Sequence, residues 1–507
     1  MARFTLAHMN KYNILHSDAY KASMAEAGAS LRDETFYQSH RRGGANGWHY
    51  LPLDIKSYVK SILPNPNDEE SFNYLKEHNY ELGAGSRKAL SLQDQLKITS
   101  IPQGSWFYNR EPYFSVAGAS FLPSWMESLN LQLQFRIQLA TAYMVQNSHP
   151  SFYGWMNKIR FATCEREKEI IEETLDSLSF NPEDKISNRF KIEVRSEQYY
   201  QDVLKRAKDL VKLVGNPDRI FEVGMRGVSC IEQHEIALQA IKDAGIVRTS
   251  NMAAAKKLEM IPVGTMGHEH IQRCGSDYAA FTSMRDRFPG FLFYLPDTFD
   301  TIRSGIPSAL KVIAESPERN AGIRFDTENG IRGHYLYTVV RARELGLEPI
   351  LALESGWNYE LTKEFEELRK QVGWKEEKQC YGFGGYLVKP SWETFNRDDV
   401  SAVWKICQTG NRATMKFGDE PNSAKESIPG KPVIWRTRPA SSSSKIVGHV
   451  YQEGEMPDSN LDIYLLSGTE SASSLYPIHS GQIVMSPETQ KLIDNCKANK
   501  AKILQEC

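Results

Sequence analysis

The sequence predicts an α/β protein whose main part is a barrel of alternating strands and helices. From residue 219 onward, short apolar runs alternate with helical patterns, which is typical of a parallel sheet with helices between its strands. Seven such units follow one another in a single run, and this favours a barrel over an open sheet. The strand candidates begin near residues 220, 246, 260, 291, 322, 349 and 380.

The rest of the chain differs from this region in pattern and predicts three further parts. Residues 1–155 mix strands and helices irregularly, with a long buried helix expected over residues 122–145. Residues 156–218 are rich in charged side chains and are interpreted as a helical connector into the barrel, which spans residues 219–390. Residues 391–507 return to short strands and polar loops, and we expect a helix near their end.

Composition excludes several classes of protein. The 507 residues are 41% hydrophobic and 24% charged, which excludes a disordered chain, a collagen or a coiled coil as a description of the whole. The 61 lysines and arginines nearly balance the 63 acids, so we expect no binding of nucleic acid through bulk charge. No stretch approaches the run of about 18 apolar residues that a membrane-spanning helix needs, so no membrane span is expected.

Cysteine usage and the first residues bear on the compartment of the protein. The seven cysteines are odd in number and show no CxxC spacing, which fits a reducing compartment better than a disulfide framework. Residues 1–13 lack the apolar core of a secretory signal peptide. Together these observations predict a cytoplasmic protein.

Charged residues and glycines follow the strand candidates, where the chemistry of α/β barrels collects. Arginine binds phosphate with a planar fork, acids hold magnesium or ribose hydroxyls, and glycines let backbone N–H groups approach a phosphate. The recurrence of these residue types predicts a site for a polyanion. The positions are Glu222, Arg226, Ser250, His268, Glu269, Asp297, Asp300, Arg324, Asp326, Glu354, Ser355, Gly384 and Gly385.

The same sequence suggests two other kinds of site, but the motif is incomplete in each case. His268 and His270, with Cys274 behind them, suggest zinc, because both histidines would face one side of a strand. The HExxH spacing is absent, however, and Cys274 has no partner cysteine nearby. The segment Gly83-Ala84-Gly85 lacks the third glycine of a dinucleotide-binding fingerprint.

A series of motifs resembles a known family. In order along the barrel region they are FEVGMRGVS, TSNMAAAKKLEMIPVGTMGHE, LPDTFDTIRSGI, GIRFDTENG, ALESGWNYELTKEFEEL and GFGGYLV. The N-terminal region adds SDAYKASMAEAG, TFYQSHRRGG and IPQGSWFYNREPYFSVAG, and the C-terminal region adds WKICQTGNRATMKFGDEPNSAKESIPGKPVIWR. These motifs resemble those of the nicotinate phosphoribosyltransferases, whose close relatives are the nicotinamide phosphoribosyltransferases. The resemblance covers roughly residues 10–140 and 219–436.

The resemblance implies a type II phosphoribosyltransferase fold, in which an irregular (β/α) barrel joins an α/β domain formed from the N- and C-terminal segments. It also implies a homodimer with shared sites. The expected reaction joins nicotinate to phosphoribosyl pyrophosphate and yields nicotinate mononucleotide and pyrophosphate, a step of NAD biosynthesis. ATP is implied as a co-substrate, hydrolysed through a phosphohistidine, and Mg²⁺ as the metal, with no ligand assigned to it.

The same resemblance assigns roles to individual residues. His268 matches the histidine that ATP phosphorylates, and Arg324 and Asp326 match catalytic positions beside the donor and the base. Tyr20 matches an aromatic residue that stacks on the pyridine from the partner chain. The remaining substrate-binding positions are Arg41, Arg42, Arg226, Ser250, Thr265, Ser355, Gly384, Gly385, Lys416 and Lys425.

Three departures from the family pattern leave alternatives open. Val223 replaces a phenylalanine that forms one face of the pyridine sandwich, and Gly227 replaces an arginine of the nicotinate branch. An Asp-Ser-Gly-Asp motif is here Asp326-Thr327-Glu328-Asn329. Ser250 is the neutral residue of the nicotinate branch, where the nicotinamide branch has an aspartate. The alternatives are a nicotinamide phosphoribosyltransferase and a catalytically silent homologue that binds nucleotide.

Overall fold

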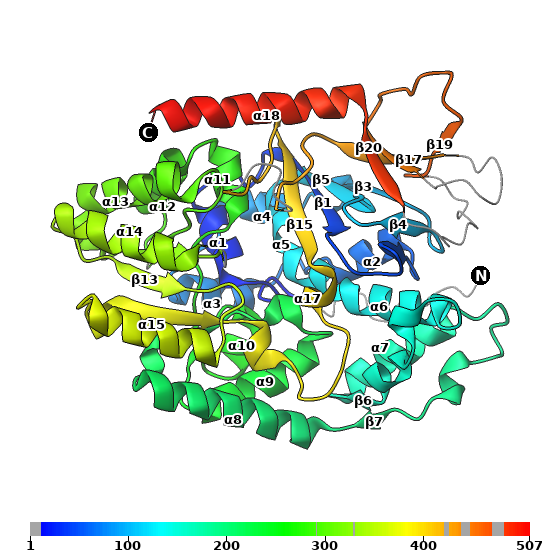
Figure 1. Cartoon of the computed structure of the whole chain (residues 1–507), viewed down its shortest axis with the longest axis horizontal. Helices are drawn as coiled ribbons and strands as arrows, with labels where there is room; N and C mark the ends of the chain where they lie inside the picture. The colour runs from blue at the N-terminus through cyan, green and yellow to red at the C-terminus, as the bar shows by residue number, and fades with distance from the viewer. Residues whose placement is uncertain are drawn as a thin grey trace.

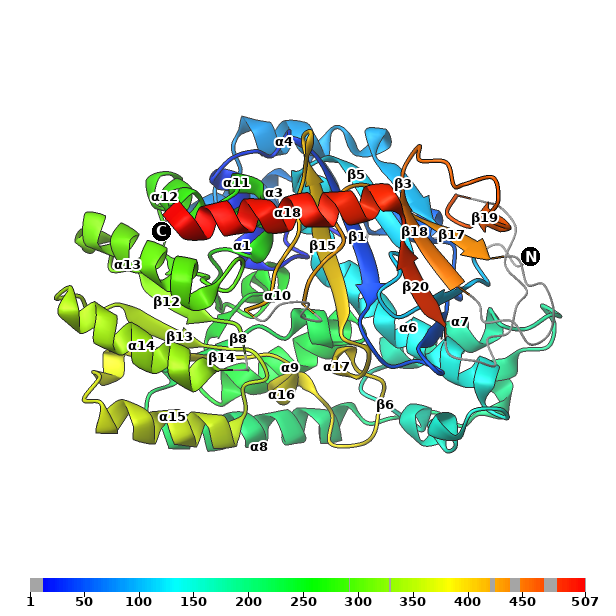
Figure 2. The same cartoon turned by 45° about the horizontal axis from the view of Figure 1, so that its top comes forward.

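The computed structural model describes residues 12–290, 292–327, 330–419, 425–437, 447–468 and 481–506. A seven-stranded parallel sheet and a five-stranded antiparallel sheet organise the chain, and they lie on opposite sides of the molecule in Figures 1 and 2. The predicted α/β class is therefore confirmed.

The parallel sheet contains all seven predicted strands. In space their order is β10-β9-β8-β14-β13-β12-β11. In the described residues the hydrogen-bonded series ends at β10 and β11 without joining them, so the sheet is a curled half-barrel. Both end strands are two residues long, which leaves little backbone with which to close the ring. The strands are β8 (Ile220–Glu222), β9 (Arg248–Thr249), β10 (Ile261–Pro262), β11 (Phe293–Tyr294), β12 (Gly322–Phe325), β13 (Ile350–Leu353) and β14 (Gln379–Phe383).

Helices follow the parallel strands and cover the outside of this sheet (Figure 2). In α13, Ile306, Leu310 and Ile313 are all buried, as their spacing predicts. The connector helix α8 (Ser196–Val214) packs against α9 and so joins the same outer layer. The other helices of this region are α9 (Ile231–Asp243), α10 (Met252–Lys257), α11 (His268–Cys274), α12 (Asp277–Arg287), α13 (Ile306–Glu315), α14 (Ile331–Glu344), α15 (Tyr359–Gln371) and α16 (Gly385–Val388).

The antiparallel sheet combines both ends of the chain, as the resemblance implies. Its order is β16-β15-β1-β5-β3, so a strand near residue 400 is the direct neighbour of the first strand. The expected helix over residues 122–145 consists of α5 (Phe121–Trp125) and α6 (Glu127–Val145), which are separated at Met126. The strands are β1 (Asp33–His40), β3 (Lys97–Ser100), β5 (Phe114–Ala119), β15 (Ala402–Thr409) and β16 (Arg412–Ala413).

Smaller elements complete the two sides. A four-stranded sheet, β19-β17-β18-β20, precedes α18 (Pro487–Glu506), which crosses the top of the molecule in Figure 1 and is the expected terminal helix. Its strands are β17 (Pro432–Thr437), β18 (Val447–Gln452), β19 (Ile463–Leu465) and β20 (Gln482–Met485). The remaining helices and strands are α1 (Ala19–Glu26), β2 (Trp48–Tyr50), α2 (Ile55–Ile62), α3 (Glu69–Glu77), α4 (Ala84–Leu90), β4 (Trp106–Tyr108), β6 (Phe161–Ala162), α7 (Glu165–Asp176), β7 (Glu193–Val194) and α17 (Arg397–Val400).

Two further observations concern the compartment and membrane expectations. The six cysteines within the described ranges are all free thiols, and the Sγ atoms of Cys164 and Cys230 lie 3.6 Å apart. Across the described ranges, no helix combines the length and apolar character that crossing a bilayer requires.

Candidate active site

A cavity of about 1070 Å³ opens at the carboxyl ends of the parallel strands. Several strand ends contribute to it, because the loops that follow parallel strands meet at one edge of the sheet. Strand β15 and the segment after it supply cationic side chains from the other domain. Glu269 and Glu354, predicted from the strand ends, line this cavity. So do twelve of the fourteen residues that the resemblance assigns to the site: Tyr20, Arg41, Arg42, Arg226, His268, Arg324, Asp326, Ser355, Gly384, Gly385, Lys416 and Lys425.

A second cavity of about 490 Å³ contains the two other predicted residues, Ser250 and Thr265. Its walls include residues at the opposite ends of the parallel strands, such as Arg248 and Cys380. The two cavities therefore meet inside the half-barrel. The residues that line both are Tyr20, Val223, Arg226, Arg324 and Glu354.

His268 is the first residue of α11 and lies at the junction of the two domains. Its Nε2 is 2.6 Å from the Nζ of Lys416, and its Nδ1 is 3.0 Å from the hydroxyl of Thr298. Burial, together with the positive charge of Lys416, lowers the pKa of His268 to about 4. The imidazole is therefore neutral at pH 7, with Nε2 accepting from Lys416 and Nδ1 donating to Thr298.

Two aspartates surround the same imidazole. Asp326 Oδ2 lies 3.5 Å and Asp297 Oδ1 lies 3.8 Å from Nε2 of His268. Burial raises the pKa of Asp326, but the proximity of His268 and the charge of Arg324 outweigh it and hold the pKa well below its usual value. These three side chains form a group that could hold a metal ion, with ligand atoms within 4.8 Å of one another. The carboxylate oxygens suit Mg²⁺, whereas the imidazole does not.

The zinc hypothesis receives no support from this arrangement. His268 and His270 lie in the helix α11 rather than in a strand, so they do not share a face. His270 is buried and its Nε2 lies near Cys274 and Ser283, at 3.7 Å and 3.4 Å. Neither His270 nor Cys274 belongs to the group around His268.

A buried carboxylate stabilises the loop that carries Arg226 through hydrogen bonds. Glu222, at the end of β8, accepts hydrogen bonds from the backbone N–H of Gly224 and from the Thr249 hydroxyl, the latter at 2.7 Å. His234 Nε2 lies 2.8 Å from the same carboxylate. The Arg226 guanidinium then reaches the cavity, with Nη1 3.6 Å from Glu127.

Tyr20 lies in the site of its own chain. The resemblance implies that this ring comes from the partner subunit, but here the Arg226 guanidinium carbon is 5.8 Å from the centre of the Tyr20 ring. The start of α1 lies against the residues that follow β9, where Ala19 N–H donates to the Ser250 carbonyl at 2.7 Å. A single chain therefore contains both Tyr20 and the arginine that faces it.

Ser250 is bonded to an acid that the sequence analysis did not single out. Its hydroxyl donates to Oδ1 of Asp18 at 2.5 Å, and the Ser128 hydroxyl donates to Oδ2 at 2.5 Å. Asp18 is 1% exposed and lines the second cavity. The cap of α10 is Asn251 rather than Ser250. Thr265, the other predicted residue here, donates to the Phe293 carbonyl at 2.8 Å.

The chain resembles known proteins in sequence and in structure. No protein-family model matches the sequence. The nicotinate phosphoribosyltransferase of Bacillus subtilis (strain 168) is 29% identical over 148 residues, a stretch that spans 29% of this chain and 29% of that protein. The resemblance found in the motifs is therefore also found by alignment, although over less than a third of either chain.

Solved structures match over most of the chain. A Saccharomyces cerevisiae protein assigned as a nicotinate phosphoribosyltransferase aligns with a TM-score of 0.56 and 18% identity, covering 82% of this chain and 95% of that one. The enzyme of that name from Vibrio cholerae aligns with a TM-score of 0.55 and 17% identity, covering 82% and 90%. The chain has the nicotinate phosphoribosyltransferase fold.

Within the nicotinate phosphoribosyltransferase fold, the larger cavity is also lined by three cationic residues that were not predicted from the sequence, and the first of them, Lys389, directly follows α16. Lys405 lies on β15, and Arg397 begins α17. Burial and the neighbouring charges of Lys416 and Arg41 hold the pKa of Lys405 well below its usual value. A lysine inside the apolar run AVWKIC was the signal that could have found Lys405, whereas nothing in the sequence distinguishes Arg397.

Two of the arginines predicted to bind phosphates, Arg41 and Arg42, donate hydrogen bonds to backbone carbonyls of the C-terminal part of the chain. Arg41 Nη2 donates to the carbonyl of Lys425 at 3.2 Å, and Arg42 Nη2 donates to that of Asp398 at 2.7 Å. Gly384 and Gly385 form the turn from β14 into α16, and a Cβ on Gly385 would lie 3.3 Å from Asp398. The arginines and the glycine turn thus face one end of the cavity.

The departures from the family pattern also lie at the site. Val223 lines both cavities, as Tyr20 does, and Gly227 lines the larger cavity. The Thr327 hydroxyl donates to Asp297 at 2.7 Å and accepts from Lys425 at 3.0 Å. Thr327 thus links an acid to a cation of the site, whereas Glu328 and Asn329 lie outside the described residues.

Proposed function

We propose that this chain is a nicotinate phosphoribosyltransferase, which joins the ring nitrogen of nicotinate to C1 of phosphoribosyl pyrophosphate. The observation that carries the proposal is one cavity that combines groups for a base with groups for phosphates. Tyr20 and Arg226 face each other in it, and the glycine turn and the cations Arg41, Lys416 and Lys425 line it too. We call the surroundings of Tyr20 and Arg226 the base end, and the surroundings of His268 and Lys416 the phosphate end. The names of the aligned proteins support the choice of reaction. A homodimer and a cytoplasmic location stay predictions.

The transfer step requires positive charge on the protein where negative charge grows on the substrate. As the bond from C1 to the pyrophosphate breaks, charge accumulates on the leaving group, which Lys416, Lys425 and Arg41 would stabilise. Arg226 and Tyr20 would hold the base so that its ring nitrogen faces C1. Asp297 and Asp326 would hold Mg²⁺, which neutralises pyrophosphate charge when bound.

ATP coupling would use the neutral imidazole of His268. In the proposed step the Nε2 lone pair attacks the γ-phosphorus of ATP, a nitrogen–phosphorus bond forms, and ADP leaves with the bridging oxygen. Water later hydrolyses the phosphohistidine to free histidine and phosphate. Lys416, 2.6 Å from Nε2 before the reaction, is placed to stabilise the transferred phosphoryl group.

A direct assay tests this proposal. Purified protein is incubated with phosphoribosyl pyrophosphate and Mg²⁺, with and without ATP, against nicotinate and nicotinamide. We expect nicotinate mononucleotide, formed faster with ATP and with hydrolysis of ATP. Preference for nicotinamide would assign the chain to the other branch. Absence of a mononucleotide product with either base would indicate a silent homologue.

Base choice is expected to depend on the charge beside Ser250. A Ser250→Asp variant places a second carboxyl group next to Asp18; at a pH where both are ionised, the added charge faces the carboxylate of nicotinate. At 4 Å and an effective dielectric near 20, the repulsion between two unit charges is about 4 kcal/mol. Screening and side-chain motion reduce this energy, so we expect the affinity for nicotinate to fall by roughly tens- to hundreds-fold. We expect the ratio of kcat/KM for nicotinate to that for nicotinamide to fall by this factor.

The matched control for this prediction is Ser250→Asn, which has the shape of the aspartate without its charge. It should change the ratio far less than Ser250→Asp does. Equal shifts in the two variants, or no shift in either, would contradict a role for charge at this position.

A further inference from the structure

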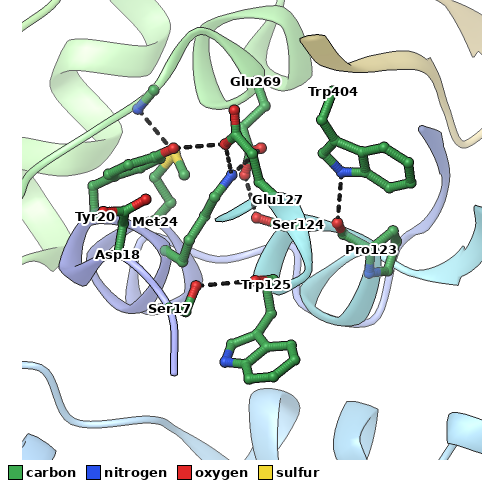
Figure 3. A network of polar contacts seen from close by, with 12 residues as sticks. Ser17, Asp18, Tyr20, Met24, Pro123, Ser124, Trp125, Glu127, Glu269 and Trp404 are labelled. Atoms are coloured by element: carbon green, nitrogen blue, oxygen red, sulfur yellow. Dashed lines mark hydrogen bonds and ion pairs between the residues drawn. The ribbon is translucent and has the colours of Figure 1, made fainter. Parts of the chain in front are cut away.

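A buried lysine beneath the cavity bridges two carboxylates from different parts of the fold. Lys21 Nζ lies 2.7 Å from Glu127 Oε2 and 2.7 Å from Glu269 Oε2, and its side chain is 1% exposed. Figure 3 shows Glu127, at the start of α6, and Glu269, on α11, converging on one point beside α1. Both carboxylates line the cavity, but Lys21 does not.

Each carboxylate is attached to a different end of the site. Glu127 Oε2 accepts from the Tyr20 hydroxyl at 2.6 Å (Figure 3). Glu127 Oε1 lies 3.6 Å from Nη1 of Arg226. Glu269 follows His268 directly in α11 and accepts from the Ser124 hydroxyl. Glu127 therefore touches the groups of the base end, and Glu269 is covalently next to the histidine of the phosphate end.

Helix α1 also packs directly against the segment that leads into His268. The Ser23 hydroxyl donates to the Thr265 carbonyl, and the Gly267 N–H lies 3.1 Å from the sulfur of Met24. A Cβ on Gly264 would lie 2.5 Å from the backbone nitrogen of Tyr20, so this close approach requires glycine. Lys21 thus lies at the contact between the two halves of the site.

We propose that Lys21 is a positioning residue that fixes the base end of the site relative to the phosphate end through Glu127 and Glu269. This inference rests on the proposed function, because that function gives the two ends their substrates. Lys21 does not line the cavity, so it acts through its neighbours: the two carboxylates and the Tyr20 ring, whose centre lies 4.8 Å from Nζ.

Charge is the physical basis of this role. Burial alone would lower the pKa of Lys21, but Glu127 and Glu269 outweigh it and raise the pKa, so the ammonium stays charged. Without that ammonium, two buried carboxylates would face each other across a short gap. One of them would take up a proton, or the elements that carry them would move apart. The other charged or titratable groups facing the pair are Asp18, Tyr20, Glu34, Arg226, Arg273 and Lys405.

The test compares Lys21→Met, Lys21→Arg and the double variant Lys21→Met/Glu269→Gln. We expect Lys21→Met to lower kcat/KM for nicotinate by about tenfold or more at pH 8, mainly through KM, because Tyr20 and Arg226 lose their fixed position. At lower pH, protonation of one carboxyl group should restore part of the activity. Lys21→Arg should retain most activity, and the double variant should recover it at pH 8 because no unbalanced carboxylate pair remains.

A matched control is Arg436→Met, which breaks another buried ion pair away from both cavities. Arg436 Nη2 lies 2.8 Å from Glu111, with side chains 2% and 0% exposed. We expect thermal unfolding to show a similar loss of stability in this control, while its KM and pH profile match those of the wild type. A Lys21→Met loss that is equal at every pH and is not recovered in the double variant would overturn the positioning role.

Failure of the two proposals gives different results. Nicotinate binding is measured by calorimetry beside the assay, so the Lys21 variants can be compared without turnover. A wild type that binds nicotinate without turnover overturns the proposed reaction, and a roughly tenfold weaker Kd in Lys21→Met then still supports the positioning role. Unchanged binding and kinetics in Lys21→Met overturn that role alone. A wild type that neither binds nicotinate nor forms product overturns both.

Discussion

Replacing His268 with asparagine is expected to abolish ATP hydrolysis and to leave slow transfer that no longer responds to ATP. Asparagine can still bond to Thr298 or Lys416, whose polar atoms lie 3.0 Å and 2.6 Å from the imidazole nitrogens. It has no imidazole lone pair, however, and so cannot form the nitrogen–phosphorus bond. Because no residual nucleophile remains at this position, the effect on ATP hydrolysis should be complete, while transfer should lose only its stimulation.

The matched control is His270→Asn, two residues further along the same helix and outside both cavities. ADP release is measured for both variants in the presence of phosphoribosyl pyrophosphate and nicotinate. The control should hydrolyse ATP close to the wild-type rate. Hydrolysis at the wild-type rate in His268→Asn would assign the phosphorylated group to another residue.

Most of the parallel sheet could be predicted from the sequence. Strands such as β8 and β12 could be placed because apolar runs alternate with helical periodicity, and both properties are local. The open edge between β10 and β11 could not be predicted, because it depends on whether two strands of only two residues each form hydrogen bonds with one another across the gap. Likewise, the separation of α5 from α6 at Met126 interrupts a run whose composition favours one helix.

Only part of the candidate site could be predicted from the sequence. His268, Arg324 and Asp326 could be predicted because the ends of parallel strands meet at one edge of the sheet, independently of the rest of the chain. The apolar run around Lys405 marks that lysine as unusual but does not place it at the site, because β15 reaches the site only through its pairing with β1 in the other sheet. The contact between Lys21 and Glu269 spans 248 positions, and no spacing rule connects them.

Arg324→Ala is expected to lower kcat/KM for phosphoribosyl pyrophosphate by well over tenfold in a protein that stays folded. Arg324 and Asp326 are two residues apart at the end of β12, so their side chains leave the strand on the same side. Arg324 Nε lies 3.7 Å from Glu354, whose pKa burial raises to about 7 despite the arginine. Removing the guanidinium therefore removes a positive charge that would bind phosphoribosyl pyrophosphate. It also leaves Glu354 and Asp326 without the positive charge that balances them.

The size of this effect follows from burial. Loss of one partner of a desolvated charge contact costs about 2–5 kcal/mol, and each factor of ten corresponds to about 1.4 kcal/mol. The backbone of β12 remains paired with β11 and β13, so the sheet should persist and circular dichroism should match the wild type. The control is Arg332→Ala, whose exposed pairing with Glu364 on the outer helices should contribute little. An unchanged kcat/KM in Arg324→Ala would leave the guanidinium as part of a structural ion pair and remove it from the reaction.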